Sequence, residues 1–214
     1  METLAQFLAE TLFGEASRSI RRRRAARVAA SLGLRFHPEG RPEHADPDAA
    51  ASLDELEALG LHLRQPVANT FAGSYQSRRM VGFANPAVWN RRRRRHVTYR
   101  FTAVALTRPL PDLLISSHAE SSLVWQWFDP DSRCLPVPVP QSASRTVAAA
   151  DPAFADSVLK ALMEAGEEPL ERSWMLRANW VVGWHRGHLR TGGGRDAEDW
   201  LRFLSAAADA CERS

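Results

Sequence analysis

The residues with the clearest chemical character are two runs of arginine. One comprises Arg91, Arg92, Arg93, Arg94 and Arg95 and follows Trp89; the other comprises Arg21, Arg22, Arg23 and Arg24. Guanidinium groups donate paired hydrogen bonds to phosphates and carboxylates, and neighbouring guanidinium groups repel one another. The two runs and Trp89 are therefore the predicted binding site, and its predicted ligand is an acidic surface. Solvated loops in an arginine-rich protein are the other interpretation of the same residues.

Motifs for catalysis or metal binding do not support a competing site. His185 and His188 have an HxxH spacing, which on a helix would let the two imidazoles bind one metal ion. Gly187 between them predicts a turn instead. Ser117 and His118 are adjacent without a Gly-x-Ser-x-Gly elbow. The glycine-rich stretch at 191–195 lacks the Lys-Ser/Thr ending of a P-loop. We predict no catalytic residue, no metal site and no cofactor. Whether the chain is an enzyme stays open, and a non-catalytic role is favoured.

The composition is that of a globular protein with an unusual choice of basic residue. Hydrophobic residues make up 44% of the chain and charged residues 25%, both ordinary values. Of the 28 lysines and arginines only Lys160 is a lysine, which indicates first a GC-rich genome. The formal net charge is only +3. Local clusters rather than the overall charge would therefore attract an anionic partner.

The cysteines and the hydropathy pattern predict a cytoplasmic protein. Cys134 and Cys211 lie far apart in unlike surroundings, which argues against a disulfide framework. No apolar run reaches the roughly 18 residues that a spanning helix needs. The first residues have no basic segment ahead of the apolar ones, unlike a secretory signal. Peripheral attachment to a membrane remains an open alternative.

Residues 2–32 are predicted to form a long helical arm. Its first half carries an apolar stripe at helical spacing, made of Leu4, Phe7, Leu8 and Leu12. Three interpretations stay open: packing of the stripe on the rest of the protein, insertion at an anionic membrane surface, and docking to a partner protein. The acidic, proline-containing stretch at 38–51 predicts a linker, and Ser52 and Glu55 resemble a capping box that starts a short helix ending at Gly60.

Strand signals follow. The runs at 67–75 and 80–84 predict a hairpin. Strict alternation predicts a half-buried antiparallel strand at 96–107, which makes 85–95 the loop that carries the arginines. Further strands are predicted at 113–117 and 145–149. The prolines at 136–140 restrict that segment to an extended or edge position.

The stretch from 150 to 189 organises the C-terminal part. Asp151 and Pro152 predict the start of a helix that ends at Gly166. Two aromatic-rich runs at 174–176 and 180–184 flank a break and predict an antiparallel hairpin. Asp196 caps a last helix with the stripe Trp200, Phe203, Leu204, Ala207 and Cys211. We predict an α+β fold with an antiparallel sheet, helices packed on one face and the helical arm. The predicted divisions are 1–32 (arm), 33–60 (linker with a short helix) and 61–214 (α+β domain).

Four segments also carry a resemblance to a known family. They are Phe71-Ala72-Gly73-Ser74-Tyr75 through Phe83; Ala103-Val104-Ala105-Leu106 with Pro109 and Pro111; Asp151-Pro152-Ala153-Phe154-Ala155 with Val158-Leu159; and the stretch from Trp174 to Trp184 with Gly187. Through them, residues 67–190 resemble an uncharacterised α+β family of high-GC Gram-positive bacteria. The resemblance implies the fold and no activity, so it transfers no catalytic residue. The arginine run at 91–95 departs from the family pattern.

From these observations we predict a non-catalytic binding or scaffold protein that applies its arm and arginine loop to the acidic surface of a protein or a membrane. The alternative is a nucleic-acid-binding module, and an enzyme of unknown chemistry is third. Tyr99 and Phe101 alternate in phase with Val97, so we assign them to the core rather than to a base-stacking surface. The sequence specifies neither the partner nor the oligomeric state.

Overall fold

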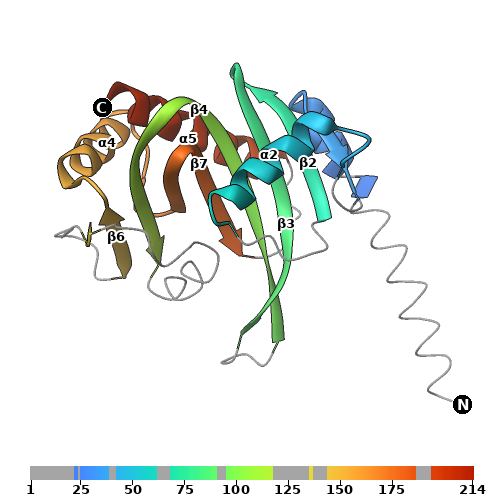
Figure 1. The fold of residues 1–214 in the computed structure, drawn as a ribbon, viewed down its shortest axis with the longest axis horizontal. Helices are drawn as coiled ribbons and strands as arrows, with labels where there is room; N and C mark the ends of the chain where they lie inside the picture. Colours follow the sequence, from blue (N-terminus) through green and yellow to red (C-terminus); the bar gives the residue numbers. More distant parts are fainter. Residues whose placement is uncertain are drawn as a thin grey trace, which may run out of the picture.

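One 23-residue strand, β4 (Arg95–Ser117), runs through the whole sheet of the computed structural model (Figure 1). The structure describes residues 22–23, 25–38, 42–61, 68–90, 95–117, 135–136, 144–186 and 194–214. At 68, 85–90, 95–98, 135–136, 186 and 194–196 the description is of the backbone alone.

The sheet has seven antiparallel strands, arranged around β4. Its order is β1 (Arg35–His37), β2 (Ala68–Tyr75), β3 (Arg78–Asn90), β4, β6 (Arg145–Ala149) and β5 (Leu135–Pro136), with β7 (Ser173–Arg186) also paired to β4. Val104 pairs with both Met80 of β3 and Val181 of β7, so these two strands lie on opposite edges of β4. Farther along, Leu114 pairs with Ala148 of β6 and with β7. Thus β3 and β6 share one edge of β4 in succession.

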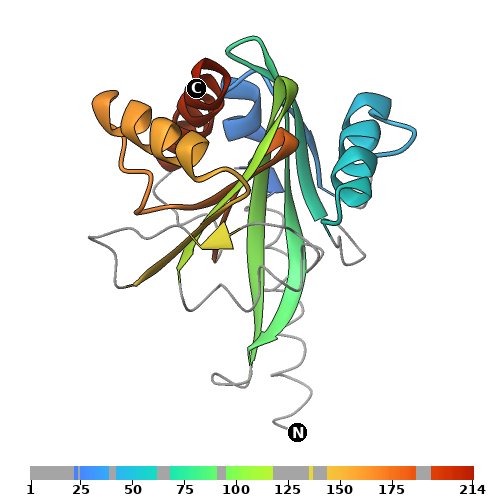
Figure 2. The ribbon, with the colours of Figure 1, turned by 60° about the vertical axis from the view of Figure 1, so that its left-hand side comes forward.

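Helices cover both faces of this sheet (Figure 2). Met80, Val104 and Val181 contribute to a core with α4 (Pro152–Glu164), α5 (Gly194–Arg213) and the helical residues 25–31. Their neighbours in the strands, Val81 among them, form a second core with α2 (Pro47–Ala58). Successive residues of a strand point to opposite faces. We call these the α4–α5 face and the α2 face.

The predicted α+β fold with an antiparallel sheet is confirmed. The prediction that the helices share one face holds for α4 and α5 and is wrong for α2. The reason is that the two sides of the central strands are both apolar: Ala103 and Val104 are each fully buried. A sheet with two apolar faces needs cover on both.

The helix α4 agrees with its prediction at both ends. The Asp151 side chain accepts hydrogen bonds from the backbone N–H groups of Ala153 and Phe154, at 2.9 and 3.2 Å, and Pro152 occupies the first turn. At the other end Gly166 has a φ of 78°, and the Glu167 N–H bonds the Leu162 carbonyl in a Schellman motif. The predicted stripe is buried, including Val158 and Leu162. The last helix, α5, buries Phe203, Leu204, Ala207 and Cys211 as predicted.

The predicted hairpin at 67–84 is present as β2 and β3. Tyr75 pairs with Arg78, so Gln76 and Ser77 form a two-residue turn. Their φ values are 49° and 65°. Positive φ at both central residues defines a type I′ turn, whose twist matches that of the flanking strands.

The predicted hairpin at 174–184 is wrong, because both aromatic runs belong to the single strand β7. Trp174 and Trp184 pair with Ile115 and Phe101 of the same neighbour, β4. The break lies at Ala178, whose φ is 49°. The register with β4 shifts there without reversing the chain. A bulge and a tight turn both interrupt an apolar run in the sequence. Only the pairing of the strand segments on either side distinguishes the two.

Most of the predicted loop at 85–95 is strand. β3 continues to Asn90 and β4 begins at Arg95, which pair with each other. The strands predicted at 96–107 and 113–117 are two parts of β4. The strand predicted at 145–149 is β6, and Pro136 lies in β5 at the edge of the sheet, as its missing N–H requires. Residues 137–140 lie outside the described part.

The stretch predicted as a linker with a short helix contributes β1 and α2. The helix begins at Pro47, so Ser52 and Glu55 lie inside it rather than at its cap. Leu53 and Leu56 of α2 are almost completely buried. Of the predicted arm, residues 25–31 are helical and Ala29 is buried against the α4–α5 face. The division of the chain into arm, linker and domain stays a prediction.

Candidate functional site

The predicted arginine loop follows the end of a two-stranded ribbon. Pairing of β2 with β3 ends at Ala84, and pairing of β7 with β4 begins at Tyr99. Beyond these positions, and among the described residues, 85–90 of β3 pair only with the start of β4, and Figure 1 shows the two strands running past β2 and β7. Trp89 lies opposite His96, and Asn90 lies opposite Arg95. Arg91, Arg92, Arg93 and Arg94 lie outside the described residues, between these paired strand ends.

The second predicted cluster lies on the helix before β1. Arg22 and Arg23 are helical and exposed, whereas Arg21 and Arg24 lie outside the described residues. At the C-terminal end of this helix the Leu34 N–H bonds the Ala29 carbonyl at 2.8 Å, and Ala29 packs in the α4–α5 core.

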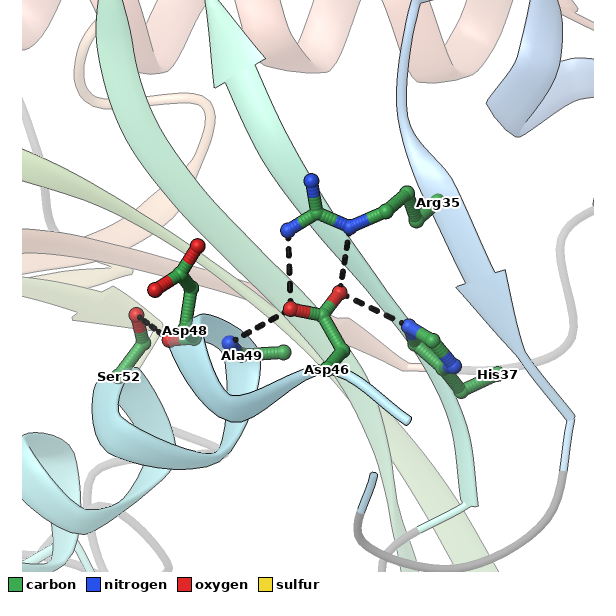
Figure 3. Close-up of polar contacts among 6 residues, drawn as sticks. All are labelled: Arg35, His37, Asp46, Asp48, Ala49 and Ser52. Atoms are coloured by element: carbon green, nitrogen blue, oxygen red, sulfur yellow. Dashed lines mark hydrogen bonds and ion pairs between the residues drawn. The ribbon is translucent and has the colours of Figure 1, made fainter. Parts of the chain in front are cut away.

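The best-connected polar group in the described part is one that the sequence did not indicate. Figure 3 shows the Asp46 carboxylate between α2 and β1. Arg35 donates to it with Nε at 2.6 Å and Nη2 at 2.9 Å, and Nε2 of His37 lies 2.9 Å from Oδ2. The Ala49 N–H donates to Oδ1 at 3.1 Å. Asp46 thus caps α2 and holds it to β1 with the same carboxylate.

Burial and its partners set the charge state of this carboxylate. The Asp46 side chain is only 2% exposed, and burial by itself would raise its pKa. The hydrogen bonds from Arg35 act more strongly and, with those from His37 and the Ala49 N–H, lower the pKa from 3.8 to about 2. The same pairing raises the pKa of Arg35. The carboxylate is therefore ionised at neutral pH.

This cluster does not have the arrangement of a catalytic triad. The Ser52 hydroxyl donates to the Asp48 carbonyl at 2.8 Å, within α2, rather than to His37 (Figure 3). His37 is bonded to Asp46 through Nε2, and the hydrogen bonds among the described residues connect it to no nucleophile. Since the group satisfies a helix cap and joins two elements, we assign it a positioning role.

Two further clusters fix helices to the sheet. Arg79 donates two hydrogen bonds to Glu55 of α2, at 2.9 and 2.7 Å, and its guanidinium lies over the Trp180 ring. Nε1 of Trp180 donates to the same carboxylate at 3.1 Å. α2 is therefore tied to the sheet at its middle as well as at its start.

The other cluster joins α5 to two strands. Arg78 lies 2.6 Å from carboxylate oxygens of both Asp209 and Glu212. Glu212 also accepts hydrogen bonds from the N–H and hydroxyl of Thr107, at 2.7 and 2.8 Å. Pairing with Arg78 first, then the bonds from Thr107, lowers the pKa of Glu212 to about 2.

The remaining sequence candidates show no shared geometry. His185 contacts the Trp200 ring edge at 5.6 Å between centroids, while His188, His118 and Cys134 lie outside the described residues. Burial raises the pKa of the Cys211 thiol to about 12, so this cysteine is not a reactive thiolate. Within the described ranges no three His, Cys, Asp or Glu side chains gather as metal ligands would.

A signal for Asp46 was present in the sequence. Asp46-Pro47 repeats the Asp-Pro pair that predicts the start of α4 at Asp151-Pro152. The surrounding acidic and proline residues favoured a linker instead. Arg35 and His37 follow the alternation of an exposed strand face, and nothing in their spacing indicates a shared carboxylate.

Comparison with known proteins gives a fold and no family. No family model matches the chain, and no curated protein matches it in sequence. Among solved structures, the mycobacterial trehalose monomycolate transport factor A, TtfA, is similar with a TM-score of 0.58 and 12% sequence identity. The match covers 89% of this chain and 93% of that one. At this identity the likeness concerns the fold alone. No helix in the described ranges is long and apolar enough to span a bilayer.

Proposed function

We propose that the protein is a non-catalytic binding protein that applies the arginine run at 91–95 to an acidic surface. The observation that supports this proposal is the two-stranded ribbon formed by the ends of β3 and β4. An isolated hairpin is marginally stable in water, but this one continues strands that are anchored in the sheet. Its end is therefore a suitable place from which to present charge beyond the body of the protein.

The residue types favour a phosphate- or carboxylate-bearing surface. Arginine binds both groups through two parallel N–H donors. Trp89, opposite His96 next to the run, is of a residue type enriched where an apolar surface meets a polar one. The exposed Arg22 and Arg23 would add charge if the helix before β1 faces the same partner. We further propose a cytoplasmic location with peripheral membrane attachment, and membership of the uncharacterised family that residues 67–190 resemble.

Nucleic acid is the second candidate ligand for the same run. Against it, Tyr99 and Phe101 are 3% and 0% exposed, so they offer no surface on which bases could stack. A likeness in fold to a transport factor is compatible with a binding role and identifies no partner. An enzyme of unknown chemistry is the third candidate.

Comparing ligand classes tests the proposal. We would measure binding of the full chain to vesicles with anionic lipid, to neutral vesicles and to a duplex oligonucleotide. The test variant is Arg91→Gln, Arg93→Gln and Arg95→Gln. The control, Arg108→Gln, Arg202→Gln and Arg213→Gln, removes the same charge from exposed positions elsewhere. We expect anionic vesicles to bind and the test variant alone to bind at least tenfold more weakly.

Other outcomes would redirect the proposal. If the oligonucleotide binds and anionic vesicles do not, the nucleic-acid role is correct, and removing one arginine that binds a phosphate should reduce the salt slope by about one unit. If both variants weaken binding equally, net charge rather than the hairpin explains the attraction. If neither ligand binds, the acidic surface must belong to a specific protein partner.

A further inference from the structure

β4 and β7 are irregular at the same level of the sheet. The register between them shifts between Ala105 and Leu110 and again between Leu110 and Leu113. Opposite Leu110 lies Ala178, with a φ of 49°. A left-handed conformation is strained for a residue that carries a Cβ. Such strain and such bulges concentrate at functional sites. We call residues 106–112 and 177–179 the β4–β7 kink.

The β4–β7 kink is accessible, although the rest of β7 is not. Arg177, Ala178 and Asn179 are partly exposed, whereas residues 173–176 and 180–184 on either side are buried. On β4, residues 107–109 are exposed and 110–112 partly exposed. A ligand from solution can therefore reach both strands at this level.

Arg177 brings a charge into the kink that no described group neutralises. Its Nη1 atom is buried and has no hydrogen-bond partner. None of the ion pairs among the described residues includes Arg177. Leaving a buried donor unpaired is destabilising, and more so when the group is charged. Such a donor needs an acceptor from outside the described contacts.

Asp112 is the one acidic residue of the kink, and its described hydrogen bonds are with the backbone. Its Oδ1 atom accepts a hydrogen bond from the Ala178 N–H at 3.4 Å, and its carbonyl accepts one from the Ala150 N–H at 2.9 Å. These contacts support the left-handed residue and connect the kink to the end of β6. Asp112 therefore shapes the kink, and none of its described contacts is with Arg177.

We propose that the β4–β7 kink binds an oxyanion, a carboxylate or a phosphate, through the guanidinium of Arg177. The planar guanidinium can donate two parallel N–H groups to two oxygens of either anion. In the partly buried setting of the kink such a pair is stronger than in water. This site uses none of the residues of the arginine run at 91–95, so it stands independently of the proposed function.

Residue-specific NMR of the full chain tests the site. The amide signals of Ala178 and Asn179 would be followed while inorganic phosphate or acetate is added at constant ionic strength. We expect saturable shifts with at least one of the two anions. Arg177→Met should weaken the apparent affinity at least tenfold, and Arg213→Gln, an exposed control on α5 outside the kink, should not. A response to phosphate alone identifies a phosphate ligand, and a response to acetate identifies a carboxylate. The absence of saturable shifts, or an unchanged affinity in Arg177→Met, would overturn the proposal.

A stability measurement separates this site from a plain ion pair. Without added anion, Arg177→Met should leave the melting temperature unchanged or raise it, because it removes an uncompensated charge. If it lowers the melting temperature, and that loss disappears in an Asp112→Asn background, Arg177 pairs with Asp112 in solution and the proposal is wrong.

Discussion

At the scale of single residues, Asp46 joins two elements of the fold, although it is not among the predicted site residues. One carboxylate caps α2 and receives Arg35 and His37 from β1. Removing this carboxylate would leave the half-exposed Arg35, His37 and the Ala49 N–H without the acceptor that they share. The first strand and the first described helix after it are therefore coupled through a single side chain.

This coupling makes stability depend on pH. The pKa of Asp46 is lowered from 3.8 to about 2 in the folded protein. The contribution of Asp46 to stability is present in full above the pKa that it has in the unfolded chain. It is lost as the pH falls through the pKa that it has in the folded protein. We expect Asp46→Asn to cost about 2 kcal/mol at neutral pH, measured by urea unfolding. The difference from wild type should shrink between pH 4 and pH 2.

Asp48→Asn is the matched control, because Asp48 lies exposed in the same first turn of α2. It should change stability by less than about 0.5 kcal/mol. Equal losses in the two variants would mean that the helix dipole, rather than the Arg35 and His37 contacts, accounts for the effect of Asp46.

Prediction from sequence succeeded for the Asp151 cap and failed for the Ser52 cap and for partners far apart in the chain. Asp151 was predicted from its neighbours, because a cap depends on residues within one helical turn. Asp46 caps a helix by the same chemistry, yet its role in joining α2 to β1 depends on Arg35, which is 11 positions away. No local pattern encodes that distance.

At the scale of elements, α4 is the clearest success of the sequence. Its stripe, cap and terminal glycine all agree with the structure. Phe154 is 8% exposed within the α4–α5 core. Phe154→Ala should therefore cost about 3–5 kcal/mol, measured by chemical unfolding. Met163 on the same helix is 57% exposed, so Met163→Ala should cost little. A loss below about 1 kcal/mol for Phe154→Ala would contradict the packing of α4 on the sheet.

The turn between β2 and β3 offers a gain in stability. Gln76 and Ser77 both hold positive φ, a conformation that Asn-Gly adopts readily in type I′ turns. Replacing them by Asn and Gly should raise the free energy of unfolding by about 1 kcal/mol, seen as a higher melting temperature. A matched change to Ala-Ala should lower it. If Asn-Gly destabilises the protein, the turn in solution is of another type.

Strands were predicted less well than helices for a physical reason. The alternation of β4 was evident, but its bulge near residues 105–113 split it into two apparent strands. The same irregularity made β7 resemble a hairpin. Pairing partners decide these cases, and pairing joins residues far apart in the chain, such as Ile115 and Trp174 or Asp112 and Ala178.

At the scale of the whole molecule, the sheet is enclosed by elements from both ends of the chain. α5 and the helical residues 25–31 meet on one face, and α2 covers the other (Figure 2). The sequence predicted the class of fold because periodicity and turn signals were strong. It did not predict the placement of α2, because a short helix with two large leucines fits either face equally well.

The predicted arm, residues 1–32, includes Ala29, which belongs to the α4–α5 core, so two deletions test where a separable arm ends. Removing residues 1–24 should leave a cooperative thermal transition close to that of the full chain. Removing residues 1–32 also takes away Ala29, which is 3% exposed in the core, and should lower the melting temperature. If the shorter deletion already prevents folding, Leu4, Phe7 and Leu8 belong to the core and the arm is not separable.

The central claim is that the β3–β4 hairpin carries the contact with an acidic surface. Its most direct test is the ionic-strength dependence of binding to anionic vesicles, for the wild type and for Arg91→Gln, Arg93→Gln and Arg95→Gln. Wild-type binding should fall steeply as salt rises, because salt screens exposed charges. The variant should bind more weakly and with a shallower dependence, at an unchanged melting temperature. Equal binding of both proteins at low salt, where attraction is least screened, would contradict the claim.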